Sequence, residues 1–88
     1  MSNISEAEKT DNELIEREFQ ALLTDYLNSN HRKKVDIIER AFRFAKEAHR
    51  GIRRRSGEPY ILHPIAVARI VCREIGLGST SICSALLH

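Results

Sequence analysis

The sequence predicts an all-α protein, a helical bundle with helices over about residues 11–28, 33–49, 64–75 and 79–88. Apolar residues recur at intervals of three and four along these segments, a spacing that gathers them on one face of a helix. Clusters of Asn, Ser, Gly and Pro separate the segments and predict turns. The 88 residues, 42% of them apolar and 30% charged, suffice for one small domain.

The first helix is expected to follow a disordered lead over residues 1–9, so that residues 10–88 form the folded part. Thr10 and Glu13 have the spacing of a capping box at the start of this helix. Its apolar face consists of Ile15, Phe19, Leu22, Leu23 and Tyr26. The polar residues 28–30, Asn-Ser-Asn, then predict a turn.

The second predicted helix has an apolar stripe made of Val35, Ile38, Phe42 and Ala45. His49 and the basic residues near its end are favoured by the helix dipole. Gly51 suits the C′ position that follows a helix. The next segment, residues 50–63, is expected to be an irregular loop with a Ser-Gly-Glu-Pro turn at 56–59 and an extended stretch at 60–62.

The third and fourth predicted helices are short and apolar. Pro64 suits the first position of a helix. The inward side chains of that helix are expected to be Ile65, Ala68, Val71, Cys72 and Ile75. Ser79 or Thr80 would cap the last helix, whose apolar residues point almost all round it, as in a buried helix. We therefore expect a bundle that is incomplete at its C-terminus, in a chain cut from a longer one, with Leu86 and Leu87 exposed and able to mediate self-association.

Charge and cysteine content limit the classes of function. The net charge of +2 is too small to indicate nucleic acid, but the acid gathers in residues 1–19 and the base in residues 43–55, so one basic patch is expected. Cys72 and Cys83 form no metal-binding or disulfide pattern, which favours a reducing cytosol. No apolar run approaches the length of a membrane span, and the polar N-terminus is not a signal peptide, so a cytoplasmic protein is expected.

His63 and His88 are candidate ligands of a metal ion. If the helices over 64–75 and 79–88 pair in antiparallel fashion, the two imidazoles lie at one end of the pair. Two histidines are few for a metal site. By spacing alone the structural alternative is therefore favoured, in which His63 is an N-cap-like residue and His88 only ends the chain.

Residues 53–55, Arg-Arg-Arg, form a cationic loop with Tyr60 a few positions later. Guanidinium groups bind phosphate through two donors and stack on flat rings. The alternative is a solvated loop, in which Glu58 is a turn carboxylate paired with one of the arginines. A nucleic-acid interface is not expected, because it requires more aromatic residues and a longer basic stripe.

The tract SGEPYILHP, followed by ALLH, resembles the hydrolase domain of the RelA/SpoT homologue family, whose members make and degrade the guanosine alarmones pppGpp and ppGpp. The resemblance covers about residues 40–88. It implies an HD-domain-like bundle, of which residues 10–88 would be the N-terminal portion. It also implies that His63 is the first ligand of a Mn²⁺ ion and His88 the histidine of a His-Asp doublet.

The same resemblance implies roles for the loop. Arg54 would stack on guanine, with Arg55 beside it where the family has an Arg-Lys pair. Ser56 and Tyr60 would lie in the part of the loop that cradles the nucleoside. The sequence departs from the family at Arg55, where lysine is usual, and at Ile52, where glutamine is frequent. The first departure keeps the charge but changes the hydrogen-bonding geometry.

The implied function is that of a fragment of a metal-dependent ppGpp 3′-pyrophosphohydrolase, part of a bifunctional synthetase/hydrolase of the stringent response. The aspartate expected after His88 and the other carboxylates that the family uses are missing from the chain. We therefore expect weak or no Mn²⁺ binding and no hydrolysis by this chain alone. The alternative is a helical interaction module whose basic loop binds an acidic partner.

Overall fold

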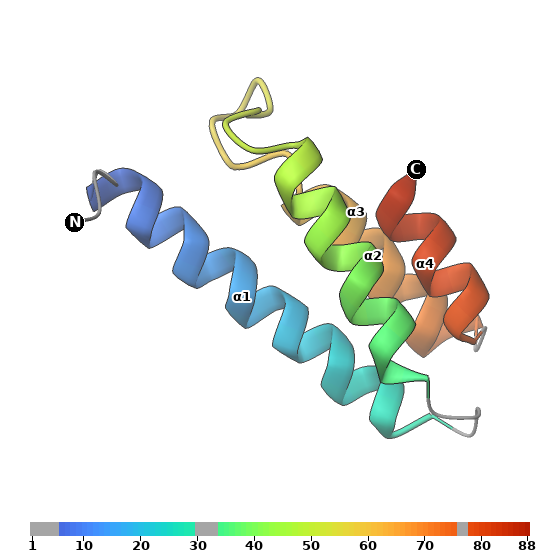
Figure 1. The fold of residues 1–88 in the computed structure, drawn as a ribbon. Coiled ribbons are helices and arrows are strands. Elements are labelled where there is room, and N and C mark those ends of the chain that lie inside the picture. The colour runs from blue at the N-terminus through green and yellow to red at the C-terminus, as the bar shows by residue number, and fades with distance from the viewer. Residues whose placement is uncertain (1–5, 30–33, 76–77) are drawn as a thin grey trace.

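Helices account for most of the residues that are described in the computed structural model, which are 6–29, 34–75 and 78–88 (Figure 1). In chain order the elements are α1 (Glu6–Leu27), α2 (Val35–Ala48), α3 (Leu62–Ile70), the π-helical turn η1 (Val71–Ile75) and α4 (Ser79–Leu87). No strand occurs within the described segments, and the predicted all-α class is confirmed. None of the helices in these segments is both long and apolar enough to span a bilayer.

The helices form a bundle in which α4 packs on α2 and on α3, while α1 packs on α3 and η1. Figure 1 shows α3 and α4 running in opposite directions, so the start of α3 and the C-terminus lie at the same end of the bundle. The loop between α2 and α3 projects from that end. One end of the molecule therefore collects the loop, the first turn of α3 and the last turn of α4.

A single apolar core joins the helices. Its buried members are Ile15, Phe19, Leu22, Tyr26, Ile38, Ala41, Phe42, Ala45, Ile61, Ile65, Ala68, Cys72, Ile82 and Leu86. The rings of Phe19 and Phe42 stack face to face, with centroids 3.8 Å apart and planes 5° from parallel. Both rings are fully buried, and aromatic side chains contribute more buried area per residue than other apolar groups. The apolar stripes predicted for the first two helices thus supply the contact between α1 and α2.

Ion pairs flank this contact. Glu16 on α1 accepts hydrogen bonds from Arg43 Nη1 at 2.6 Å and from Lys46 Nζ at 2.9 Å, both on α2. Partial burial raises the pKa of Glu16, but the hydrogen bonds from Arg43 and Lys46 outweigh it and hold the pKa below its usual value. The carboxylate is therefore the stable form against α2 at neutral pH.

The first two helices differ from the prediction at their ends. α1 begins at Glu6, so residues 6–9 are helical and not part of a disordered lead; residues 1–5 lie outside the described residues. The acidic first turn, with Glu6 and Glu8, complements the helix dipole and explains the earlier start. The predicted capping box is wrong, because Thr10 lies inside the helix and its hydroxyl donates to the Glu6 carbonyl at 3.0 Å.

The third helix also begins earlier than predicted, at Leu62 and not at Pro64. Ile61 has helical backbone angles (φ −57°, ψ −25°), so the expected extended stretch at 60–62 is wrong. Ile61 is 2% exposed, and its burial in the core starts the helical turn at that point. Pro64 becomes the third helical residue, where a missing N–H has no intrahelical partner to lose.

The last helix is buried on one side and not all round. Ile82 and Leu86 are fully buried, whereas Leu87 is 52% exposed. Leu86 is therefore unavailable for the self-association that the sequence suggested. The N-cap residue of α4 is Gly78, so the prediction that Ser79 or Thr80 caps this helix is wrong.

Phe42→Ala is expected to lower the free energy of unfolding by about 3–5 kcal/mol, because it removes one ring of the buried stack and leaves a cavity. Phe44, on the same helix, is 71% exposed and provides a matched control. Phe44→Ala should change the free energy by no more than about 0.5 kcal/mol. Urea unfolding followed by circular dichroism measures both, and equal losses would contradict the assignment of the core.

Candidate functional site

The loop between α2 and α3 has no strand, as predicted, but one isolated backbone bridge shapes its tip into a small hairpin. Arg53 and Pro59 form an antiparallel bridge. Inside the bridge, the N–H of Arg54 donates to the Glu58 carbonyl at 2.9 Å, and the N–H of Gly57 donates to the Arg54 carbonyl at 2.8 Å. Gly57 has a φ of +103°, a value that side chains disfavour, which explains glycine at this turn. The backbone bonds give the arginine segment a defined shape.

The hairpin is fixed at its base and exposed at its tip. Pro59 and Ile61 are buried, whereas residues 53–57 are exposed. His49 forms the C-cap of α2, and Gly51 turns the chain with a φ of +79°. The core therefore holds both ends of the hairpin and leaves its charged side chains in solvent.

Arg54 lies between a carboxylate and an imidazole. Its Nε is 3.9 Å from Glu58 Oε1, and its Nη1 is 3.4 Å from His63 Nδ1. The predicted base-stacking residue and the predicted first metal ligand are thus neighbours, although nine positions separate them in the sequence. The Arg54–Glu58 pair agrees with the turn carboxylate considered in the sequence analysis.

Ser56 and Glu58 form the tip of the site. The Ser56 hydroxyl lies 2.8 Å from both Oε1 and Oε2 of Glu58 and donates to the carboxylate. This hydrogen bond, the backbone N–H of Glu58 itself and the charge of Arg54 lower the pKa of Glu58 below its usual value. Because the Ser56 hydroxyl donates to Glu58, it helps to orient the Glu58 carboxylate that faces Arg54.

Tyr60 and Arg55 have different surroundings. The half-buried Tyr60 ring lies with its centroid 4.7 Å from that of His49 and 6.2 Å from that of His63. Arg55 is exposed, and no ion pair or hydrogen bond of its side chain occurs within the described part of the chain. Of the loop residues predicted to bind substrate, Arg54, Ser56 and Tyr60 are held by neighbours, whereas Arg55 extends into solvent.

His63 and His88 line one pocket of about 280 Å³ between the start of α3 and the end of α4. The hydroxyl-bearing residues Ser81 and Ser84 line it as well, and Tyr60 stands at the side of the hairpin. The volume is just below the range of about 300–1,000 Å³ that encloses a drug-sized ligand. A nucleotide would therefore enter the pocket only in part. The antiparallel course of α3 and α4 places both histidines in the lining of this pocket, the arrangement expected if these two helices pair in antiparallel fashion.

Two imidazoles fit a divalent transition metal as part of a ligand set. No cluster of three or more His, Cys, Asp or Glu side chains able to hold an ion occurs among residues 6–29, 34–75 and 78–88. His63 and His88 are thus an incomplete set within the described chain. Metal binding by these two residues stays a prediction.

The contact with Arg54 restricts how His63 can bind an ion. A guanidinium only donates, so a hydrogen bond from Arg54 to His63 requires the tautomer with the lone pair on Nδ1 and the hydrogen on Nε2. An ion at Nδ1 would take the lone pair that Arg54 uses. An ion at Nε2 would require the other tautomer, whose Nδ1–H cannot accept from Arg54. Ion binding at His63 and the Arg54–His63 contact therefore exclude each other.

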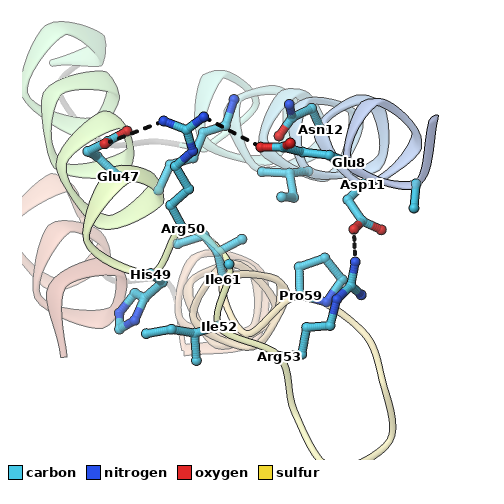
Figure 2. Close-up of a pocket in the computed structure, with 14 residues that line it drawn as sticks. Glu8, Asp11, Asn12, Glu47, His49, Arg50, Ile52, Arg53, Pro59 and Ile61 are labelled. Carbon is cyan, nitrogen blue, oxygen red and sulfur yellow. Dashed lines mark hydrogen bonds and ion pairs between the residues drawn. The ribbon is translucent and has the colours of Figure 1, made fainter. Parts of the chain in front are cut away.

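A second pocket, of about 470 Å³, was not predicted (Figure 2). It lies between the N-terminal half of α1, the end of α2 and the base of the hairpin. Figure 2 shows an ion pair from Arg50 to Glu8 and another from Arg53 to Asp11 along its rim. The sequence signal for this rim was the spacing of Glu8 and Asp11, which lie three residues apart and therefore on one face of a helix.

The sequence is similar to three proteins of guanosine polyphosphate metabolism. It is 47% identical to the GTP pyrophosphokinase of Streptomyces coelicolor over 51 residues, which are 58% of this chain and 6% of that protein. It is 44% identical over 62 residues to the guanosine-3′,5′-bis(diphosphate) 3′-pyrophosphohydrolase of Aquifex aeolicus, 70% of this chain and 9% of that protein. With the bifunctional (p)ppGpp synthase/hydrolase RelA of Mycobacterium tuberculosis the identity is 44% over 54 residues, 61% of this chain and 7% of that protein.

The chain spans less than a tenth of the length of each of these relatives. No family model matches the sequence, and no solved structure matches it.

Ser56→Ala should raise the pKa of Glu58 toward its usual value, because the largest cause of the lowered pKa is removed. Since folding lowers this pKa, the stabilisation of the hairpin by Glu58 is present above the unfolded-state pKa and is lost as the pH falls through the folded-state pKa. In Ser56→Ala that stabilisation is smaller, and its loss is complete at a higher pH. An NMR titration of the Glu58 carboxyl carbon measures the shift, with Ser56→Thr as the hydroxyl-retaining control; an unchanged pKa in Ser56→Ala would contradict the role of Ser56.

Proposed function

We propose, on the premise that the chain belongs to the RelA/SpoT homologue family, that it supplies the guanine-nucleotide-binding hairpin and two metal ligands of a ppGpp 3′-pyrophosphohydrolase. The names of two relatives record 3′-pyrophosphohydrolase and (p)ppGpp synthase/hydrolase activity. Because the chain spans less than a tenth of those proteins, the activity of the whole protein and its place in a bifunctional enzyme of the stringent response are parts of the proposal.

The contact between Arg54 and His63 is the observation that carries this proposal. It puts a guanidinium suited to stacking on a base 3.4 Å from an imidazole that lines the His63–His88 pocket. A nucleotide whose base lies on Arg54 would have its phosphate groups directed toward that pocket. Base binding at one side and phosphate chemistry at the other is the arrangement that positions a substrate for reaction.

Each residue of the hairpin has a task in this proposal. Glu58 orients Arg54 while leaving its planar face open, and Ser56 keeps Glu58 ionised. Tyr60 offers a flat surface beside His63, on which a sugar or base can pack. Arg55, whose side chain extends into solvent, is available to bind phosphate.

When bound, a divalent ion such as Mn²⁺ would be held by His63 and His88 and would neutralise phosphate charge and lower the pKa of a bound water. The exclusion between the ion and the Arg54–His63 contact fits a site in which His63 binds the ion and Arg54 binds the base. With an ion on His63, Arg54 would lose this acceptor, and its guanidinium would be free to stack on a base. The contact between Arg54 and His63 in this way couples the base-binding part of the site to the ion-binding part.

Arg54→Ala is expected to weaken the binding of ppGpp or GDP by about 1–2 kcal/mol, or about five- to thirtyfold in Kd, through the lost cation–π contact and lost packing. Arg40→Ala, which removes one positive charge from the exposed part of α2, controls for net charge. Calorimetric titration measures both variants. Equal affinities of Arg54→Ala and Arg40→Ala, or no preference for GDP over ADP, would favour an interaction module that binds acidic partners.

The purified 88-residue chain should release no pyrophosphate from ppGpp in excess Mn²⁺. The candidate site provides the imidazoles of His63 and His88, and the described residues include no cluster of three ligands. A weakly held ion does not generate a strong nucleophile from water. A coupled pyrophosphate assay, with the Aquifex aeolicus relative as the positive control, measures the rate. Turnover comparable to that of the relative would overturn the assignment of the metal site.

A further inference from the structure

Arg53 has a different role from the two arginines that follow it. Its Nη2 forms an ion pair with the Asp11 carboxylate on α1 (Figure 2). Its Nη1 donates to the Gly57 carbonyl at the tip of the hairpin. One guanidinium therefore joins α1 to the hairpin and closes the hairpin on itself. Both terminal nitrogens of Arg53 are thus engaged within the protein.

The ion pair between Arg53 and Asp11 lies at the rim of the 470 Å³ pocket. The Asp11 side chain is 24% exposed and that of Arg53 is 45% exposed, so solvent screens the pair only in part. A second ion pair, from Arg50 Nη2 to Glu8 Oε1 at 3.5 Å, joins α1 to the segment just before the hairpin. The N-terminal half of α1 thus holds the loop at two successive points.

This contact matters because hydrogen bonds and ion pairs at the surface, and no core contacts, hold the tip of the hairpin. Residues 53–57 are exposed and contribute nothing to the core. An exposed segment of this kind loses conformational entropy when it is ordered, at about 1–2 kcal/mol for each residue backbone. α1 is itself fixed by the buried Phe19 ring, so a bond from α1 to Arg53 restrains the residue directly before Arg54.

We propose that Asp11 is a positioning residue for the nucleotide-binding hairpin, acting through Arg53. The inference rests on the proposed function to the extent that the hairpin binds a guanine nucleotide. Asp11 itself touches no ligand. It orders the hairpin in advance, so that less entropy is lost when the base binds to Arg54.

The variant Asp11→Asn tests the proposal in the complete 88-residue chain, by two measurements. Amide hydrogen exchange of Arg54 and Gly57, whose N–H groups close the hairpin, should become faster, because local opening is easier. The Kd for GDP should rise about two- to fivefold, the range of a partly exposed ion pair. The exchange of core amides should stay unchanged, which a general loss of structure would not allow.

Three further variants make the test specific. Glu13→Gln removes one negative charge from an exposed position of α1 and should leave hairpin exchange and Kd at wild-type values. Asp11→Glu should keep both at wild-type values, and the charge-exchanged pair Asp11→Arg with Arg53→Asp should recover part of the loss, because it restores the ion pair but cannot donate to the Gly57 carbonyl. Failure of every rescue, or equal effects of Asp11→Asn and Glu13→Gln, would overturn the proposal.

Two outcomes separate this inference from the function on which it rests. Faster hairpin exchange in Asp11→Asn, in a protein whose wild type binds no guanine nucleotide, would support the ordering role and reject the proposed function. Tighter GDP binding by Asp11→Asn would overturn the positioning role, because Arg53 would then be a ligand-binding side chain that Asp11 withholds.

Discussion

The fold depends on burying the apolar face of α1 against the rest of the bundle. Phe19 lies flat on Phe42 with the ring centroids 3.8 Å apart, and neither ring is exposed. The same face of α1 continues toward the N-terminus as the acidic residues Glu8 and Asp11. Once the aromatic stack sets the rotation of α1, these carboxylates face the end of α2 and the hairpin. The packing of the core in this way decides which charges meet at the functional end.

The three consecutive arginines show how the same side chain takes different roles in different surroundings. Arg53 joins α1 to the hairpin, Arg54 lies between Glu58 and His63, and Arg55 extends into solvent. Guanidinium groups are always charged and only donate, so the position of acceptors decides what each one does. A run that looks uniform in the sequence thus combines a structural pair, a candidate base-binding group and a candidate phosphate-binding group.

The position of His63 follows from the burial of its neighbours. Ile61, the N-cap residue of α3, and Ile65, inside that helix, belong to the core and lie four residues apart on one face. His63, midway between them, lies on the opposite face, exposed and lining the pocket beside α4. The burial of the two isoleucines therefore suffices to orient the His63 imidazole toward the pocket that His88 also lines.

The sequence by itself determined the helical class and the apolar stripes of α1 and α2, because these depend on local spacing. A short tract that resembles a known family also indicated the candidate site residues, whose roles stay a prediction. Tertiary structure alone decided the start of α3, where the burial of Ile61 outweighs the preference of Pro64 for the first helical position. It also decided the pairing of Asp11 with Arg53, 42 positions apart, and the contact of Arg54 with His63. Local propensities do not encode such contacts. Which charge meets which partner depends on how the core orients the elements that carry them.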